Sequence, residues 1–173
     1  MKIRVISVGN KCPVWIRQGF DEYAKRMPKE MPLSLTEIAA PKHHQHSSKI
    51  NQLEAKKILE RIQASDWVIA LDEKGQHYSS PALARHLEDW RELGKDVVFI
   101  VGGANGLALE LLERADQRLS LSALTFPHYL VRVLIAETLY RAWSISIGHP
   151  YHRKLSPRKL HYLSKIKGLL FSR

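Results

Sequence analysis

Residues 97–106 read VVFIVGGANG, and this stretch decides the fold. Five consecutive apolar residues, most of them β-branched, are typical of a strand that is buried on both faces of a parallel sheet. The glycines at 102, 103 and 106 then indicate a tight turn, because glycine adopts backbone conformations that other residues avoid. Residues 107–115 follow with the spacing of a helix. A buried strand, a turn and a helix in succession are the building unit of an α/β domain.

The same alternation extends in both directions along the chain. We expect strands at 1–8, 33–38, 67–71, 97–101 and 118–121, and helices that begin near residues 13, 50, 80, 107 and 128. Ser80, followed by Pro81, is the expected N-cap of the third helix, and polar loops are expected at 41–48 and 72–78. Five strands alternating with five helices predict one α/β domain, with a parallel or mostly parallel sheet and helices on both faces. Ligands bind such sheets beyond the carboxyl ends of the strands, in loops that begin here at Gly9, Asp72, Gly102 and Ser122.

The composition is that of a globular protein, with 173 residues of which 45% are hydrophobic and 25% charged. No apolar run reaches the length of a membrane span, and the first residues lack the apolar core of a signal peptide. The single cysteine, Cys12, cannot form an intramolecular disulfide. We therefore expect a cytoplasmic protein with no membrane association.

The charge balance is strongly basic. Lysine and arginine number 27 against 17 acidic residues, for a net charge of +10. Residues 151–173 contain seven Lys/Arg and no Asp or Glu, so most of the excess lies at the carboxyl end. This uneven distribution favours a nucleic acid partner over a protein that is merely basic.

Two segments are candidates for a ligand site. The first is the glycine turn, whose G-G-x-x-G spacing differs from the dinucleotide fingerprint and which lacks the Lys-Ser/Thr pair of a P-loop. A ligand-binding turn and a purely structural turn fit this pattern equally well. The second is 119–128, LSLSALTFPH, whose small and hydroxyl residues expose backbone groups. Such groups suit a flat heterocycle such as adenine, but a plain connecting loop has the same composition.

The helix after Pro127 has two apolar faces on roughly opposite sides. One face can pack against the sheet, and the other favours a partner subunit in a homodimer over a helix buried wholly within one chain. Between the faces lie Arg132, Glu137 and Arg141, and the last two form an i,i+4 pair. The first face contains Val131, Leu134, Ile135, Thr138 and Ala142, and the second contains Val133, Ala136, Tyr140 and Trp143.

Three polar features are less informative. The motif HPYHR at 149–153 combines cations for phosphates with rings for stacking, as an RNA contact would, although a basic tail has the same composition. His43, His44 and His46 have no Cys or nearby carboxylate to complete a metal site, so we expect a solvated loop and no metal. Cys12 has no neighbouring histidine in the sequence, which argues against a catalytic thiol.

Together, several segments resemble the RlmH family of ribosomal RNA methyltransferases, which belongs to the SPOUT class. The resemblance covers about residues 1–153. Its segments are MKIRVISVGNKCPVWIRQGFDEYAKRMP, Leu71-Asp72, VGGANGL, LSLSALTFPHYLVRVLIAETLYRAWSI and HPYHR. It implies a SPOUT-type α/β fold with a C-terminal trefoil knot, a homodimer, and S-adenosyl-methionine as the methyl donor. The implied reaction is methylation of N3 of pseudouridine 1915 in helix 69 of 23S ribosomal RNA, on the assembled 70S ribosome. No metal is needed.

The resemblance also implies site residues. Those for the cofactor are Leu71, Gly102, Gly103, Leu121, Ser122, Ala123, Leu124, Thr125 and Phe126. Arg141, Tyr151 and His152 match positions tied to activity, and His128, Glu137 and Arg153 are expected to contact the substrate. Removal of the N3 proton would need a base, for which His128, Glu137 and His152 are the candidates.

Members of the family usually end just after the residues that match 151–153. The chain therefore divides into one methyltransferase domain at 1–153 and a basic extension at 154–173, for which we expect contacts with ribosomal RNA. A ribosome-binding protein that kept the fold without the activity is the alternative. A nucleotide-dependent oxidoreductase is not supported, because the glycine spacing and an acidic ribose-binding residue are both missing.

Overall fold

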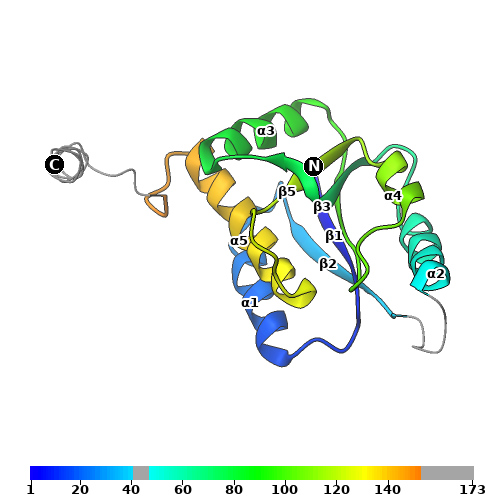
Figure 1. Ribbon diagram of the computed structural model, residues 1–173. Coiled ribbons are helices and arrows are strands. Elements are labelled where there is room, and N and C mark those ends of the chain that lie inside the picture. Colours follow the sequence, from blue (N-terminus) through cyan, green and yellow to red (C-terminus); the bar gives the residue numbers. More distant parts are fainter. Residues whose placement is uncertain (41–46, 153–173) are drawn as a thin grey trace, which may run out of the picture.

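The computed structural model describes residues 1–40 and 47–152, and Figure 1 labels their strands and helices. Strands and helices alternate strictly, as the sequence predicts. In chain order the elements are β1 (Ile3–Val8), α1 (Val14–Ala24), β2 (Leu33–Ile38), α2 (Ser47–Leu59), β3 (Trp67–His77), α3 (Ser80–Glu92), β4 (Val97–Val101), α4 (Leu109–Arg114), β5 (Gln117–Ser120) and α5 (His128–Ser146).

The five strands form one sheet in the order β2-β1-β4-β3-β5, and every pair of neighbours is parallel. In the register, Ile3 of β1 stands opposite Leu33 on one side and Val97 on the other. Because β4 lies at the centre, all five of its residues are buried. This confirms the prediction that the apolar run 97–101 is a strand covered on both faces.

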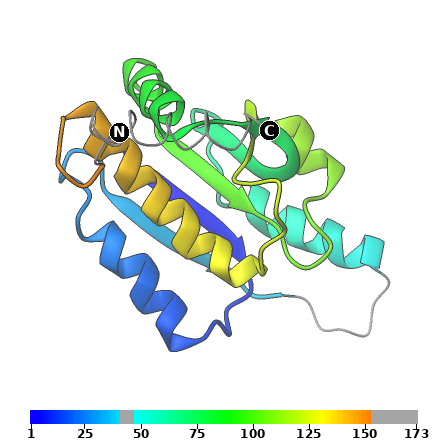
Figure 2. The ribbon, with the colours of Figure 1, turned by 60° about the vertical axis from the view of Figure 1, so that its left-hand side comes forward.

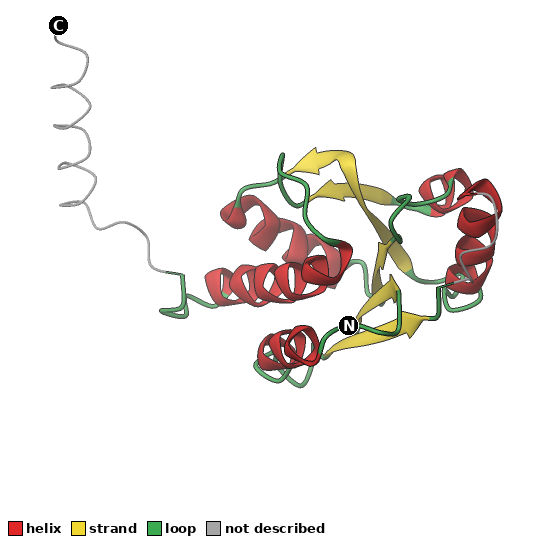
Figure 3. Cartoon of the chain, turned by 60° about the horizontal axis from the view of Figure 1, so that its bottom comes forward, coloured by secondary structure: helices red, strands yellow, loops and turns green. Residues whose placement is uncertain are grey.

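Helices cover both faces of the sheet (Figures 2 and 3). On one face, α1, α3 and α5 bury residues such as Phe20, Leu87 and Ile135. On the other, α2 and α4 contribute Ile58 and Leu111 to a second, smaller core. Successive side chains of β4 enter the two cores in turn, with Val97, Phe99 and Val101 in one and Val98 and Ile100 in the other. The sheet is therefore the middle layer of three.

Strand β3 is longer than the sequence indicates. The polar loop predicted at 72–78 is wrong, because the strand continues to His77 after an irregularity in its pairing with β5. Leu71 and Gln76 both pair with Leu119, so the residues between them bulge out of the ladder. A Cβ at Gly75 would lie 2.6 Å from the Leu119 carbonyl carbon, which only glycine avoids. The bulge projects Asp72 and Glu73 beyond the sheet edge, where they line a cavity.

The N-cap of α3 is also one residue earlier than predicted. Ser79, not Ser80, has the extended backbone of a cap, and its hydroxyl accepts a hydrogen bond from the Ala82 amide at 3.3 Å. Pro81 then occupies the first turn, where its missing N–H is not needed.

Helix α5 packs against α1 and α3 and is the longest helix in the described part of the chain. Each of its two predicted apolar faces is partly buried. In the second face, Ala136 and Tyr140 are buried and Val133 faces Gly19 of α1, while Trp143 retains some exposure. In the first face, Ile135 and Ala142 are fully buried, whereas Val131, Leu134 and Thr138 retain some exposure. Across residues 1–40 and 47–152, neither α5 nor any other helix is long and apolar enough to cross a membrane.

Candidate functional site

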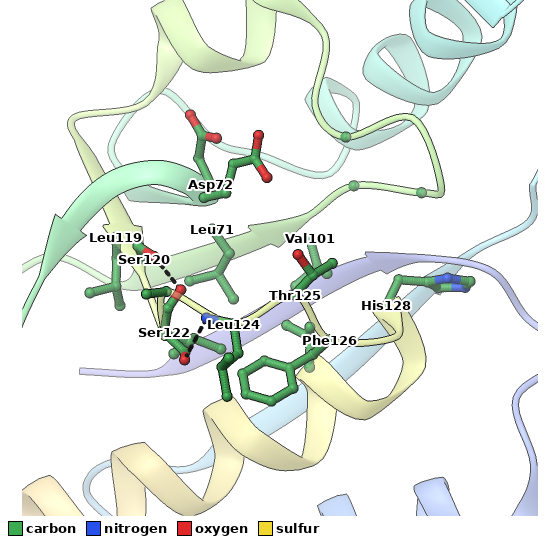
Figure 4. Close-up of a pocket in the computed structure, with 17 residues that line it drawn as sticks. Leu71, Asp72, Val101, Leu119, Ser120, Ser122, Leu124, Thr125, Phe126 and His128 are labelled. Atoms are coloured by element: carbon green, nitrogen blue, oxygen red, sulfur yellow. Dashed lines mark hydrogen bonds between the residues drawn. The ribbon is translucent and has the colours of Figure 1, made fainter.

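A cavity of about 220 Å³ opens at the carboxyl edge of β3, β4 and β5 (Figure 4). Three segments that are far apart in the sequence form its wall: the bulge of β3, the glycine turn after β4 and the loop between β5 and α5. Their carboxyl ends meet because the strands are parallel and adjacent. The lining includes all nine residues that the sequence assigns to the cofactor: Leu71, Gly102, Gly103, Leu121, Ser122, Ala123, Leu124, Thr125 and Phe126.

The loop 121–127 is shaped by hydrogen bonds from two serines. Ser120 donates its hydroxyl proton to the Ser122 carbonyl at 3.1 Å, and the Ser122 hydroxyl accepts the Leu124 amide at 2.9 Å. These two bonds, dashed in Figure 4, fold the loop back on itself beside Leu71. Pro127 then caps α5 and ends the loop. The two serine hydroxyls therefore hold the loop in this shape, and the other backbone groups of the loop remain available to a ligand.

The glycine turn is closed so tightly that side chains would not fit. A Cβ at Gly102 would lie 2.5 Å from the Gly106 carbonyl oxygen, and Gly106 has a positive φ of 74°. The Gly106 amide donates to the Gly103 carbonyl at 3.1 Å. The backbone of the turn consequently forms part of the cavity surface, a point that the G-G-x-x-G pattern alone left open.

The cavity combines an apolar interior with a polar rim. Leu71, Val101, Leu119 and Phe126 supply the apolar surface, and Asp72 and Glu73 bring carboxylates to the edge. An apolar slot suits a flat ring, and the acidic rim attracts a cation. Among residues 1–40 and 47–152 there is no group of three His, Cys, Asp or Glu side chains that could hold a metal ion. The three histidines at 43, 44 and 46 lie outside the described residues.

His128 is the first residue of α5 and lines the cavity. Its ring lies away from the apolar wall in Figure 4 and packs at a tilt of 43° against the ring of Tyr129, with ring centroids 4.0 Å apart. Burial lowers the pKa of His128, and the positive charge of Arg132 lowers it further. Its imidazole is therefore neutral near pH 7 and can accept a hydrogen bond.

The predicted catalytic residues form a separate cluster near the other end of α5. Glu137 pairs with Arg141, as the i,i+4 spacing indicated, and accepts the Tyr151 hydroxyl at 3.0 Å. The Arg141 guanidinium lies 4.9 Å from the centre of the Tyr151 ring. Burial raises the pKa of Tyr151 well above its usual value, and hydrogen bonds with Tyr23 and Glu137 add to the effect. Tyr151 therefore stays protonated and serves as a donor, not as a base.

Within one chain, this cluster does not reach the cavity. Arg141 lies thirteen residues after His128 on α5, which is about 20 Å at 1.5 Å per residue. Tyr151 contacts Glu137 and Arg141 and so lies at the same distant end, while His152 follows it and is half-buried. Arg153 lies outside the described residues. The structure thus brings the predicted cofactor residues together but leaves the predicted catalytic residues apart from them.

Sequence reasoning missed the most heavily bonded side chain near the site. Arg132 was expected between the apolar faces of α5, yet its side chain is fully buried. It donates to the Ser7 hydroxyl, the Val8 and Gly9 carbonyls, and the Glu37 carboxylate. The signal was present in the sequence, because Arg132 stands three and four residues before the buried Ile135 and Ala136 and so shares their side of the helix.

Comparison with known proteins agrees with this architecture. A family model described as "Predicted SPOUT methyltransferase" matches residues 1–152. "Ribosomal RNA large subunit methyltransferase H" of Hahella chejuensis (strain KCTC 2396) is 48% identical over 156 residues, which cover 89% of this chain and 100% of the relative. The protein of the same name from Chromohalobacter salexigens is 46% identical over 155 residues, or 88% of this chain and 100% of the relative.

A solved structure of a probable methylase family protein from Haemophilus influenzae Rd KW20 has a TM-score of 0.50 and 14% identity, over 98% of this chain and 78% of that one. At this identity the likeness shows the fold alone. The family model, by contrast, spans most of the chain, and the relatives align over their whole length at nearly half identity. The chain therefore belongs to the SPOUT methyltransferases, within the RlmH family of ribosomal RNA large subunit methyltransferases.

Proposed function

We propose that this protein transfers a methyl group from S-adenosyl-methionine to N3 of pseudouridine 1915, in helix 69 of 23S ribosomal RNA. The substrate would be the assembled 70S ribosome in the cytoplasm. The observation that carries the proposal is the cavity between the glycine turn and the 121–126 loop, in a chain whose relatives are named ribosomal RNA large subunit methyltransferase H. The net charge of +10 supports an RNA partner.

The residues of the cavity fit this donor. Leu71, Leu119 and Phe126 offer an apolar slot for adenine, and the exposed backbone of the 121–126 loop offers hydrogen bonds to its edge. Asp72 and Glu73 bring negative charge to the cavity rim, which suits the sulfonium and the ammonium group of the donor. When bound, the donor supplies a methyl group activated by the positive charge on sulfur. The role of the protein is then mainly to hold the acceptor in line with that group.

His128 is placed to meet the acceptor at the cavity edge. The N3 proton of pseudouridine must leave before or during attack, and a positioned acceptor would help it to leave. Of the three candidate bases, His128 alone lines the cavity within the same chain, and its lowered pKa keeps the free ring nitrogen available near pH 7. Glu137 is already engaged by Arg141 and Tyr151.

We infer that a complete site needs two subunits. The Arg141–Tyr151 cluster lies about 20 Å from His128 along α5, so it cannot serve the cavity of its own chain. An antiparallel pairing of α5 with its copy would bring the cluster of one subunit to the cavity of the other. The partly covered face at Val131, Leu134 and Thr138 supports this homodimer. Arg141 and Tyr151 would then bind the phosphates or stabilise the uracil anion, with His152 and Arg153 beside them.

Two parts of the proposal follow from the resemblance to the family. One is the C-terminal trefoil knot, with which the five-stranded parallel sheet is compatible. The other is the boundary between the domain at 1–153 and the basic extension. The curated relatives align over their full length but cover only 88–89% of this chain. This difference supports an extension that the relatives lack. We propose that residues 154–173, which lie outside the described residues together with Arg153, add contacts to ribosomal RNA.

The test is methyl transfer from labelled donor to ribosomes that carry the unmethylated pseudouridine. Wild type should transfer the label. Gly103→Arg should lose donor binding, because its side chain would run into the Glu54 carboxylate and displace the Gly103 backbone from the cavity wall. Arg141→Ala, by contrast, should bind the donor but lose transfer. Arg91→Ala, an exposed ion-paired residue on α3, is the matched control and should remain active. Activity in both site variants would refute the site assignment, and a wild type that binds ribosomes without transferring the label would favour a binding protein.

A further inference from the structure

Glu54 is a buried carboxylate directly behind the glycine turn. It belongs to α2 and is only 6% exposed. A Cβ built on Gly103 would lie 3.0 Å from each of its two carboxylate oxygens. The carboxylate therefore lies flat against the Cα of a residue that also lines the cavity. Glu54 itself does not line the cavity, so it acts on the turn from behind.

Burial of the charged Glu54 carboxylate costs free energy. Burial raises the pKa of Glu54, while the Gly103 amide and the Lys57 charge oppose that rise. A buried carboxylate without compensating partners is expensive, so its presence needs a reason. The Gly103 amide and the Lys57 ammonium both favour the ionised form of the carboxyl.

The glycine turn is closed by its own backbone hydrogen bond from Gly106 to Gly103, but it has no large apolar side chain that could anchor it to the rest of the protein. Residues 102–106 read GGANG, and none of them has an apolar side chain larger than that of alanine. Asn51, one turn before Glu54 on α2, donates its side-chain amide to the Asn105 carbonyl at 3.4 Å. Helix α2 thus contacts the turn at two points, both on the side away from the cavity. Without such anchors, a segment with three glycines would lose much conformational entropy on binding a ligand.

We propose that Glu54 is a positioning residue for the methyl donor, because its carboxylate fixes the Gly103 peptide in the cavity wall from behind. This inference rests on the proposed function, since it assigns the cavity to S-adenosyl-methionine. Pre-organisation of the turn lowers the entropic cost of binding and leaves the chemistry of transfer untouched. Loss of Glu54 should therefore weaken donor binding and raise KM for the donor, with kcat at saturating donor nearly unchanged.

Calorimetric titration of the full chain with S-adenosyl-homocysteine tests the inference. Glu54→Ala should weaken binding about tenfold, because the Gly103 peptide would no longer be held in place before the donor binds. Glu54→Gln keeps an acceptor of the same length and should stay within about threefold of wild type. Glu54→Asp keeps the charge but falls one methylene short of Gly103, so it should behave like the alanine variant. Glu60→Ala, exposed just beyond the end of α2, is the control and should bind like wild type.

The outcomes separate this inference from the proposed function. Wild type that fails to bind S-adenosyl-homocysteine would overturn the cofactor assignment itself. Wild type that binds, together with alanine and aspartate variants that bind equally well, would overturn only the role of Glu54. A loss of kcat at saturating donor in step with binding would indicate a merely structural residue and would also overturn it. If the alanine variant does not fold, the contrast between the aspartate and glutamine variants decides.

Discussion

Replacement of Arg132 by methionine should destabilise the protein more than replacement of any exposed arginine. The buried guanidinium joins α5 to the carboxyl ends of β1 and β2 through Ser7, Val8, Gly9 and Glu37. Methionine fills part of the space of the arginine side chain but has no hydrogen-bond donor. The Val8 and Gly9 carbonyls would lose the guanidinium donors, and the helix that follows the cavity loop would lose its polar anchor.

The magnitude follows from the nature of the contacts. Removal of one partner from a buried ion pair costs about 3–5 kcal/mol, because the remaining groups are left without compensation. Glu37 keeps its pairing with Arg17, so the carboxylate itself is not left alone. We therefore expect a loss of about 3–4 kcal/mol in the free energy of unfolding, as two carbonyls and one hydroxyl lose their donor. For a chain of this size, that corresponds to a fall of about 6–16 °C in Tm.

Urea unfolding followed by circular dichroism, at one fixed protein concentration, measures this loss. Arg91→Met is the matched control, because Arg91 is half exposed and pairs only with Glu88 on the same helix. It should cost under about 1 kcal/mol. If Arg132→Met cost no more than that control, with the slope of the transition unchanged, the reasoning about the buried arginine would be wrong.

Three further predictions concern charge, assembly and the extension. Because burial raises the pKa of Glu54 above its ordinary value of 4.5, the folded state favours the protonated form. The free energy of unfolding should thus fall as pH rises from about 4.5 through the folded pKa, and Glu54→Gln should remove this fall in urea titrations at successive pH values. Mixing inactive Arg141→Ala and Gly103→Arg subunits should restore about a quarter of wild-type transfer, since half the dimers are mixed and each has one intact site. No recovery would contradict a site shared between subunits. Deletion of residues 156–173 should weaken ribosome binding and reduce its salt dependence in sedimentation assays, and unchanged binding would exclude a role for the extension.

The sheet was predictable because its central strands are buried on both faces. The apolar run 97–101 identifies β4 without ambiguity, and the run at 67–71 marks the start of β3. The continuation of β3 to His77 was not predictable, because its residues are polar and its pairing with β5 resumes only after a bulge. Similarly, Ser79 and Ser80 stand next to each other at the start of α3, and only backbone geometry identifies Ser79 as the cap.

The site was predictable in its parts but not in its arrangement. Glycines and small hydroxyl residues after neighbouring parallel strands indicated a ligand edge, and the resemblance supplied the residues that turn out to share one cavity. Helical periodicity placed Arg132 between the two apolar faces of α5, and it could not identify the main-chain carbonyls at the end of β1 that bind the guanidinium. The sequence does place His128 and Arg141 thirteen residues apart on one helix, but it could not reveal that Tyr151 folds back onto Glu137 and Arg141.

The most direct test of the central claim is the identity of the modified nucleotide. Ribosomes lacking the modification would be incubated with the protein and S-adenosyl-methionine, and the 23S RNA would then be digested and analysed by mass spectrometry. We predict one added methyl group on pseudouridine 1915, and no such addition with Gly103→Arg. No methylation, or a methyl group on a different nucleotide, would contradict the account.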